Sequence, residues 1–152
     1  MKQIRIKVNK IIERFLVLIL VGMVLNVIWQ VFTRFLTSSP SAFTNELARY
    51  LMIWLGILGA AYISGKQEHV AIDFFVKKLN NSLRRYIDRF VLLSTLSFAF
   101  FVMIIGGINL VYITLKLEQY SPSLQIPLAL VYSIIPISGL LIIFYKVTQE
   151  KS

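Results

Sequence analysis

The sequence of 152 residues contains no cysteine and a single histidine, His69. Without cysteine, the chain has no disulfide and no thiol nucleophile. One histidine without cysteine does not supply the three or four protein ligands of a zinc site. Neither a GxGxxG loop nor a Walker A pattern occurs, and no Ser/His/Asp set has support. We therefore expect no catalytic residue, no bound cofactor and no metal site.

Acidic residues are also scarce, since 7 Asp and Glu stand against 16 Lys and Arg and give a net charge of +9. In a soluble protein this balance would suggest nucleic acid as a partner. However, 57% of the residues are hydrophobic and the mean hydropathy is +0.75, whereas soluble domains have about 45–50% apolar residues. The basic residues flank apolar segments, as topology anchors do. We predict an integral membrane protein that contacts phospholipid and no nucleic acid.

Four apolar segments are long enough to cross a bilayer, and we predict spans over residues 15–36, 43–64, 86–115 and 124–145. As a helix, the first would extend about 33 Å. It is too long for a signal-peptide core and no cleavage site follows it, so we expect it to be retained. Pro136 should kink the fourth span. The expected fold is an all-α integral membrane protein with four transmembrane helices in a single membrane domain.

The longest polar connection, Lys66–Arg89, also has a pattern. Apolar residues recur at i, i+3, i+4 and i+7, namely Ile72, Phe75, Val76 and Leu79, and charged residues take the other side, namely Asp73, Lys77 and Lys78. This pattern predicts a short amphipathic helix over residues 70–79 that lies in the headgroup plane. His69, Arg84 and Arg85 flank it at the expected cytoplasmic interface. For His69 we favour a cap or loop hydrogen bond over pH sensing.

Positive charge predicts the orientation of the four spans. Thirteen of the 16 basic residues lie in the N-terminal segment, the 66–89 connection and the C-terminal tail. Cytoplasmic segments carry an excess of Lys and Arg. We therefore expect both termini and the amphipathic helix in the cytoplasm, and the short loops 37–42 and 116–123 on the outer side.

Three polar residues, Asn26, Gln30 and Arg34, form a stripe at i, i+4 and i+8 along the first predicted span. Polar groups that face lipid are unfavourable, so the stripe should face protein or water. It is compatible with a path for substrate or protons, or with hydrogen bonds between helices. We favour the hydrogen bonds, because no acidic residue lies in the middle of a span to relay a proton.

Two charged residues, Glu46 and Arg49, lie at i and i+3 near the outer end of the second span, at a depth similar to that of Arg34. The sequence thus predicts a cluster of three charges. It would either neutralise charge where helices meet or orient a partner helix, and these two roles are not exclusive.

Small residues collect further along the second span, at Gly56, Gly59, Ala60 and Ala61. Small side chains let helix backbones approach closely in lipid. We favour a packing role, although Gly and Ala are also simply common in membrane helices. Trp54 is deep enough in the span to pack against a neighbouring helix.

Two motifs cover much of the chain in order. The first is Glu46-Leu47-Ala48-Arg49-Tyr50, followed by Trp54, Gly59-Ala60 and His69-Val70; the second is Tyr120-Ser121-Pro122-Ser123-Leu124, followed by Ile126-Pro127, Tyr132 and Ile135-Pro136. In order and spacing they resemble the small membrane subunit (DctQ type, or Q subunit) of TRAP transporters, the tripartite ATP-independent periplasmic transporters. Asn81 departs from the resemblance, because relatives often have proline there, but Asn80 can still cap that helix.

The resemblance implies a role in a bacterial inner membrane. A periplasmic binding protein (P type) captures an organic acid of the C4-dicarboxylate, sialic acid or sugar-acid class, and a large subunit (M type) carries it inward with sodium by an elevator movement. The small subunit packs against the scaffold of the large one and helps to receive the binding protein. The loop residues Ser39, Pro40, Tyr120 and Pro122 would lie beneath that protein. Sodium is expected on the large subunit.

An alternative is a self-contained, proton-coupled exporter that works as a homodimer of four-helix subunits. Such proteins couple transport to a carboxylate embedded in the membrane. Glu46 is the nearest candidate here, and it lies too close to the outer surface. A membrane enzyme, as a third hypothesis, lacks any reactive set of residues.

Overall fold

The computed structural model describes residues 2–37, 42–66 and 81–149. Its helices are α1 (Lys2–Thr37), α2 (Ala42–Gly65), α4 (Asn81–Ser97), the π-helix η1 (Phe98–Gly106), α5 (Gly107–Lys116), α6 (Leu128–Tyr132) and α7 (Ile134–Gln149). Four helical stretches are long and apolar enough to cross a membrane: Gln3–Leu36, Ala42–Gly65, Arg85–Lys116 and Leu128–Thr148. The predicted all-α fold with four membrane-length helices is confirmed.

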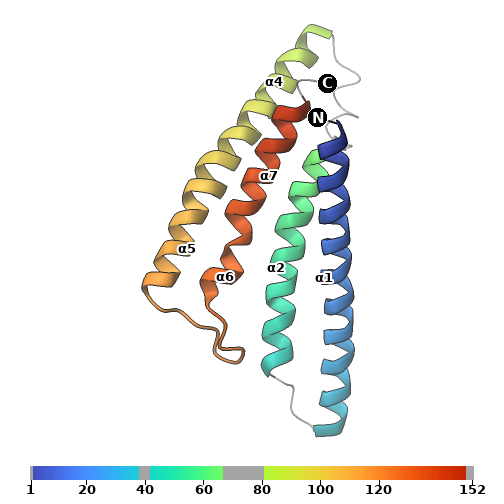
Figure 1. Cartoon of the computed structure of the whole chain (residues 1–152), viewed down its shortest axis with the longest axis vertical. Helices are drawn as coiled ribbons and strands as arrows, with labels where there is room; N and C mark the ends of the chain where they lie inside the picture. The colour runs from blue at the N-terminus through green and yellow to red at the C-terminus, as the bar shows by residue number, and fades with distance from the viewer. Residues whose placement is uncertain (1, 38–41, 67–80, 150–152) are drawn as a thin grey trace.

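The four long stretches stand side by side in a single layer (Figure 1). The main neighbour of α1 is α2, the other side of α2 contacts α7, and α7 in turn contacts η1 and α4. In space, the fourth stretch therefore lies between the second and the third. The start of α1 and the end of α7 lie at one end of the layer, which we call the terminal end. The connection from α5 to α6, residues 117–127, lies at the opposite end, which we call the loop end.

The helix boundaries differ from the predicted spans at several places, and two of these differences have a clear local cause. The first helix begins at Lys2 rather than at Phe15, because Lys, Arg, Gln and Glu are good helix formers and extend the apolar segment. Residues 124–127, which we expected in the fourth span, belong instead to the loop, and α6 begins at Leu128. The cause is local, since Gln125 has a left-handed φ of 53° and Pro127 disfavours a helical conformation at Ile126.

Pro136 is associated with an interruption of the fourth stretch. The α6 helix ends at Tyr132, and α7 begins after a turn at Ser133. Because proline has no N–H, it leaves the carbonyl of Tyr132 without its helical donor. The facing stretch is irregular at the same level, since η1 ends at Gly106 and a Cβ on Gly107 would lie 2.9 Å from Cδ of Pro136. The two irregular segments are therefore in direct contact.

Two buried clusters hold the layer together, and α7 contributes to both. One consists of Ile12, Leu58, Ile134 and Tyr145, and the other of Ala61, Ala99, Met103 and Ile142. Elsewhere, large apolar side chains cover the outside of the helices, including Phe35 at 83% exposure and Phe90 at 73%. A surface of this kind is suited to lipid or to another membrane subunit.

Candidate functional site

The carboxylate of Glu46 joins the start of α2 to the loop between α5 and α6. Its Oε2 accepts hydrogen bonds from the backbone N–H groups of Ser123 at 2.9 Å and Leu124 at 3.2 Å. Its Oε1 accepts one from the hydroxyl of Tyr50 at 2.8 Å. We call these four residues the loop-end junction. Glu46 and Tyr50 lie one turn apart on α2, so the helix orients the carboxylate toward a loop that is distant in sequence.

The loop itself has a defined backbone structure. It leaves α5 through a Schellman-type end, in which the N–H of Gln119 donates to the carbonyl of Thr114 at 3.1 Å and Glu118 has a left-handed φ of 46°. An isolated bridge then pairs Tyr120 with Pro127. Tyr120 and Pro122, two of the predicted periplasmic contact residues, are exposed on this loop.

The structure does not bring the three predicted charges together. Arg34 and Arg49 are exposed, and within the described residues neither forms an ion pair with Glu46. The groups that donate hydrogen bonds to this carboxylate are neutral, namely two backbone N–H groups and a tyrosine hydroxyl, and not arginine side chains. Two backbone N–H groups stabilise a carboxylate much as a helix N-terminus does.

The polar stripe of α1 divides between the inside and the outside of the chain. Asn26 is buried and donates a hydrogen bond of 2.7 Å to the carbonyl of Thr44 on α2. Gln30 is half-buried, and its backbone carbonyl accepts a hydrogen bond of 3.0 Å from the hydroxyl of Thr33. Arg34 is exposed in the last turn of α1. Only Asn26 thus makes the interhelical hydrogen bond that we favoured for the stripe.

Trp54 packs inside the chain. Its indole N–H donates to the carbonyl of Val131 at 3.0 Å, which joins α2 to α6. Its ring centroid lies 6.0 Å from that of Phe15 on α1. Trp54 therefore contacts α1 on one side of α2 and α6 of the fourth stretch on the other, and it is a packing residue of this subunit.

Three of the small residues that we singled out on α2, namely Gly56, Gly59 and Ala60, face open space, whereas Ala61 is fully buried against Ala99, Met103 and Ile142 as a packing role requires. A Cβ added at Gly56 or Gly59 would meet no atom within 4 Å, and Ala60 is exposed. Three glycines that the sequence analysis did not single out are the closely packed ones. A Cβ at Gly65 would lie 2.8 Å from the ring of Tyr145, and one at Gly139 would lie 2.9 Å from Cβ of Met103; Gly107, against Pro136, is the third. No sequence signal separates the two groups, because both are glycines in apolar helices.

Polar side chains at the terminal end link α1 to the other helices. Arg5 donates a hydrogen bond to the carbonyl of Gly65, the last residue of α2. The hydroxyl of Tyr145 on α7 donates to Oδ1 of Asn9 at 2.6 Å. These contacts close the terminal end across α1, α2 and α7.

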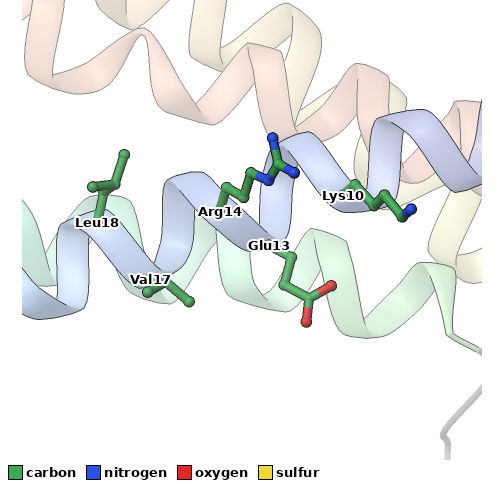
Figure 2. A pocket seen from close by; sticks show the side chains of 5 residues that line it. All are labelled: Lys10, Glu13, Arg14, Val17 and Leu18. Carbon is green, nitrogen blue, oxygen red and sulfur yellow. The ribbon is translucent and has the colours of Figure 1, made fainter.

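An open hollow of about 580 Å³ lies along α1 near the terminal end; the described residues that line it are Lys10, Glu13, Arg14, Val17 and Leu18. Figure 2 shows Arg14 and Leu18 on one side of the helix and Glu13 and Val17 on the other. Glu13 also accepts a long hydrogen bond, 3.4 Å, from the hydroxyl of Tyr62. The hollow thus combines two cationic side chains and one carboxylate with two apolar side chains.

Several predicted residues lie outside the described part of the chain. These are Ser39, Pro40, His69, Asp73, Lys77 and Lys78, together with the predicted interfacial helix over residues 70–79. Arg84 belongs to α4, and Arg85 is exposed on the same helix. Among the residues that the structure does describe, no three His, Cys, Asp or Glu side chains gather as a metal site would require.

The sequence matches the family described as "Tripartite ATP-independent periplasmic transporters, DctQ component" over residues 23–149. It is 28% identical over 145 residues to a Haemophilus influenzae protein assigned as a TRAP transporter small permease protein, a match that covers 93% of this chain and 86% of the relative. It is 35% identical over 102 residues to the C4-dicarboxylate TRAP transporter small permease protein DctQ of Rhodobacter capsulatus, with 66% of this chain and 44% of the relative covered.

A third relative is much longer. The sialic acid TRAP transporter permease protein SiaT of Haemophilus influenzae is 36% identical over 62 residues, which make up 41% of this chain but 10% of that permease. The chain therefore spans less than half of DctQ and one tenth of SiaT. A family match over most of the chain, together with four membrane-length helices, indicates a multi-pass membrane component of a transporter and not an enzyme. The chain belongs to the DctQ family, the small membrane subunits of TRAP transporters.

Proposed function

We propose that this chain is the accessory subunit that packs against the large M-type subunit of a sodium-driven, binding-protein-dependent importer of organic acids. The open face of α2 is the observation that carries the proposal. Gly56 and Gly59 have no neighbour within 4 Å of a built Cβ, although they lie in an apolar helix. Small residues favour close approach of a second helix in lipid. The helices that the structure describes do not use that surface, so it is available to a partner subunit.

The match to SiaT supports the same partner. In that permease, the segment similar to this chain is one tenth of a longer polypeptide. Because this segment and the rest of that permease belong to one polypeptide, the two parts stay close to each other. We infer that the separate small subunit makes the corresponding contact without the covalent link.

The orientation that we propose puts both termini in the cytoplasm and the loop end in the periplasm of a bacterium, with the chain in the inner membrane. The terminal end carries Arg5, Lys10 and Arg14, and such a concentration of positive charge favours the cytoplasmic side. The P-type binding protein would then dock above the loop end. The exposed residues Tyr120 and Pro122, on a loop that Glu46 anchors, suit a preformed contact surface.

We assign substrate and sodium binding to the large subunit. The relatives point to a C4-dicarboxylate or to sialic acid as the substrate class. In this chain, the hydrogen bonds of Glu46 with Tyr50 and the loop backbone support a structural role. A proton-coupled exporter needs a carboxylate that is free to exchange its proton with substrate. A layer that is one helix thick is also better suited to a scaffold role than to enclosing a transport path.

Phospholipid is the third proposed partner. The hollow on α1 presents Lys10 and Arg14 near the terminal end, with Val17 and Leu18 deeper along the helix. Anionic headgroups are attracted to basic residues at the cytoplasmic surface. Anionic phospholipid would therefore accumulate along this rim.

The test is co-purification of the tagged chain from cells that also produce the large subunit. We expect a one-to-one particle by mass photometry or native mass spectrometry, and sodium-dependent uptake of an organic acid when the binding protein is added. Gly56→Leu should reduce the yield of this particle. Gly22→Leu should not, because Gly22 is also open but has no second small residue three or four positions away. A particle that contains only copies of this chain would refute the proposal.

A further inference from the structure

One polar residue in the third membrane-length stretch has no contact that accounts for it. Asn109 lies in α5, seven residues before Lys116 at the loop end, and hence about 10 Å deeper along the helix axis. Its side chain is exposed and makes no hydrogen bond within the part of the chain that the structure describes. An amide that faces hydrocarbon loses its hydrogen bonds to water, so the position calls for a polar neighbour.

The direction of Asn109 excludes the other helices within residues 2–37, 42–66 and 81–149 as that neighbour. Gly107 and Thr114, which are buried, mark the side of α5 that faces the chain, with Gly107 against Pro136 of α7. Asn109 is two residues beyond Gly107, which places it about 200° around the helix at about 100° per residue. It therefore points away from α6 and α7, the two helices against which α5 packs.

Asn109 is part of a longer polar face. Tyr112 and Lys116 follow at i+3 and i+7, which is the spacing of one side of a helix. Tyr112 is 60% exposed, and Lys116 is exposed as well. We call these three residues the α5 polar face. It combines an amide within the membrane, a hydroxyl above it and a cation near the outer headgroup level.

We propose that the α5 polar face binds a transmembrane helix of the large subunit, one that presents a hydrogen-bonding side chain opposite Asn109 and a carboxylate near Lys116. The inference rests on the proposed function, because it takes the large subunit as the partner. Charge complementarity decides between this occupant and a second copy of the chain. In a two-fold pair of α5 helices, Lys116 would face Lys116, and like charges repel.

The experiment measures binding of the fluorescently labelled chain to the large subunit in nanodiscs. Asn109→Leu removes the amide and keeps the size of the side chain, and we expect about 3-fold to about 20-fold weaker binding. The matched control is the double variant Asn109→Leu/Leu110→Asn, which keeps the composition of the helix but turns the amide by about 100°. We expect it to bind as weakly as the single variant.

Three results would overturn the inference. They are unchanged binding of Asn109→Leu, full recovery in the double variant, and a wild-type chain that dimerises through α5 and loses the dimer on Asn109→Leu. A photo-crosslinking residue at position 109 should also capture the large subunit, and one at position 110 should not; capture of lipid alone at position 109 counts against the contact. If the wild-type chain does not bind the large subunit at all, the proposed function itself fails.

Discussion

The helices α1 and α7 are both long and apolar, yet they hold opposite positions in the structure. In the apolar window of the first stretch, which lies in α1, 11% of the residues are buried, against 39% in the apolar window of the fourth stretch, which α6 and α7 form. The difference arises from the layer, because α7 has a helix on each side and α1 packs mainly against α2. Hydropathy does not separate them, since lipid is as apolar as a protein core. What distinguishes α7 from α1 is the presence of close helix–helix contacts at small residues.

The glycines make this comparison concrete. Gly139 of α7 is pressed against η1, whereas Gly22 of α1 has open space around it. A larger side chain should therefore destabilise this subunit at Gly139 and should leave its stability unchanged at Gly22.

Gly139→Leu should destabilise the isolated subunit by about 3 kcal/mol or more, because overpacking forces neighbouring groups apart. A Cβ at this position would already lie 2.9 Å from Cβ of Met103 and 3.1 Å from the carbonyl oxygen of Ala99. Gly22→Leu is the matched control and should leave the stability unchanged. Thermal unfolding of both purified variants in the same detergent measures the difference. Equal stability would show that the contact between α7 and η1 is not tight.

Glu46→Ala should destabilise the loop end by about 2 kcal/mol, since it leaves the N–H of Ser123 without its acceptor and the N–H of Leu124 with only the longer bond of 3.3 Å to Oγ of Ser121. Glu46→Gln keeps one oxygen for these donors and should lose less than about 1 kcal/mol. Limited proteolysis of the loop between α5 and α6, together with the unfolding free energy in detergent, tests both variants. If the loop resists the protease equally in all three proteins, the loop-end junction does not hold it.

Trp54→Phe removes the indole N–H that binds the carbonyl of Val131 while it keeps an aromatic ring near Phe15. We expect a loss of about 1 kcal/mol, the usual net value of a hydrogen bond. Trp29→Phe on α1 is the control, because Trp29 is 63% exposed and should tolerate the change. A loss at Trp29 as large as that at Trp54 would contradict the contrast between the outer and the central helices.

Tyr62→Phe should have the smallest effect, less than about 0.5 kcal/mol. It removes a long and exposed hydrogen bond to Glu13, and it keeps the ring over which Lys66 lies at 4.7 Å from the centroid. Tyr145→Phe removes a shorter bond, the one to Asn9, and should lose about 1 kcal/mol. Urea unfolding of both variants in mixed micelles compares them, and the reverse order would refute the prediction.

The number of long helices and their approximate limits were predictable from the sequence. Length and apolar composition are local properties, and so is the interruption near Pro136, which follows from a missing N–H. The small residues Gly56 and Gly59 were also expected to serve packing, and in this structure they lie on an open face. In the proposed function, the large subunit covers that face.

The lateral order of the helices and the role of Glu46 were not predictable. The partners of Glu46 lie 77 and 78 residues away, and they are backbone N–H groups, which every loop offers. Sequence patterns therefore favoured Arg34 and Arg49 as its partners, because only side-chain charges are visible in a sequence. The π-helical turn of η1 gave no signal either, since it occurs within a continuous apolar run.

The place of α7 between α2 and η1 has a consequence for biogenesis. A ribosome delivers the third membrane-length stretch before the fourth, so α4, η1 and α5 enter the bilayer before the helix against which they pack. Until α7 is synthesised, the α1–α2 hairpin and the third stretch have no common neighbour, and the layer assembles only as translation ends. In a chain that terminates before Leu128, the α1–α2 hairpin and the third stretch would therefore stay unpacked against each other, and we expect membrane quality control to recognise such a chain.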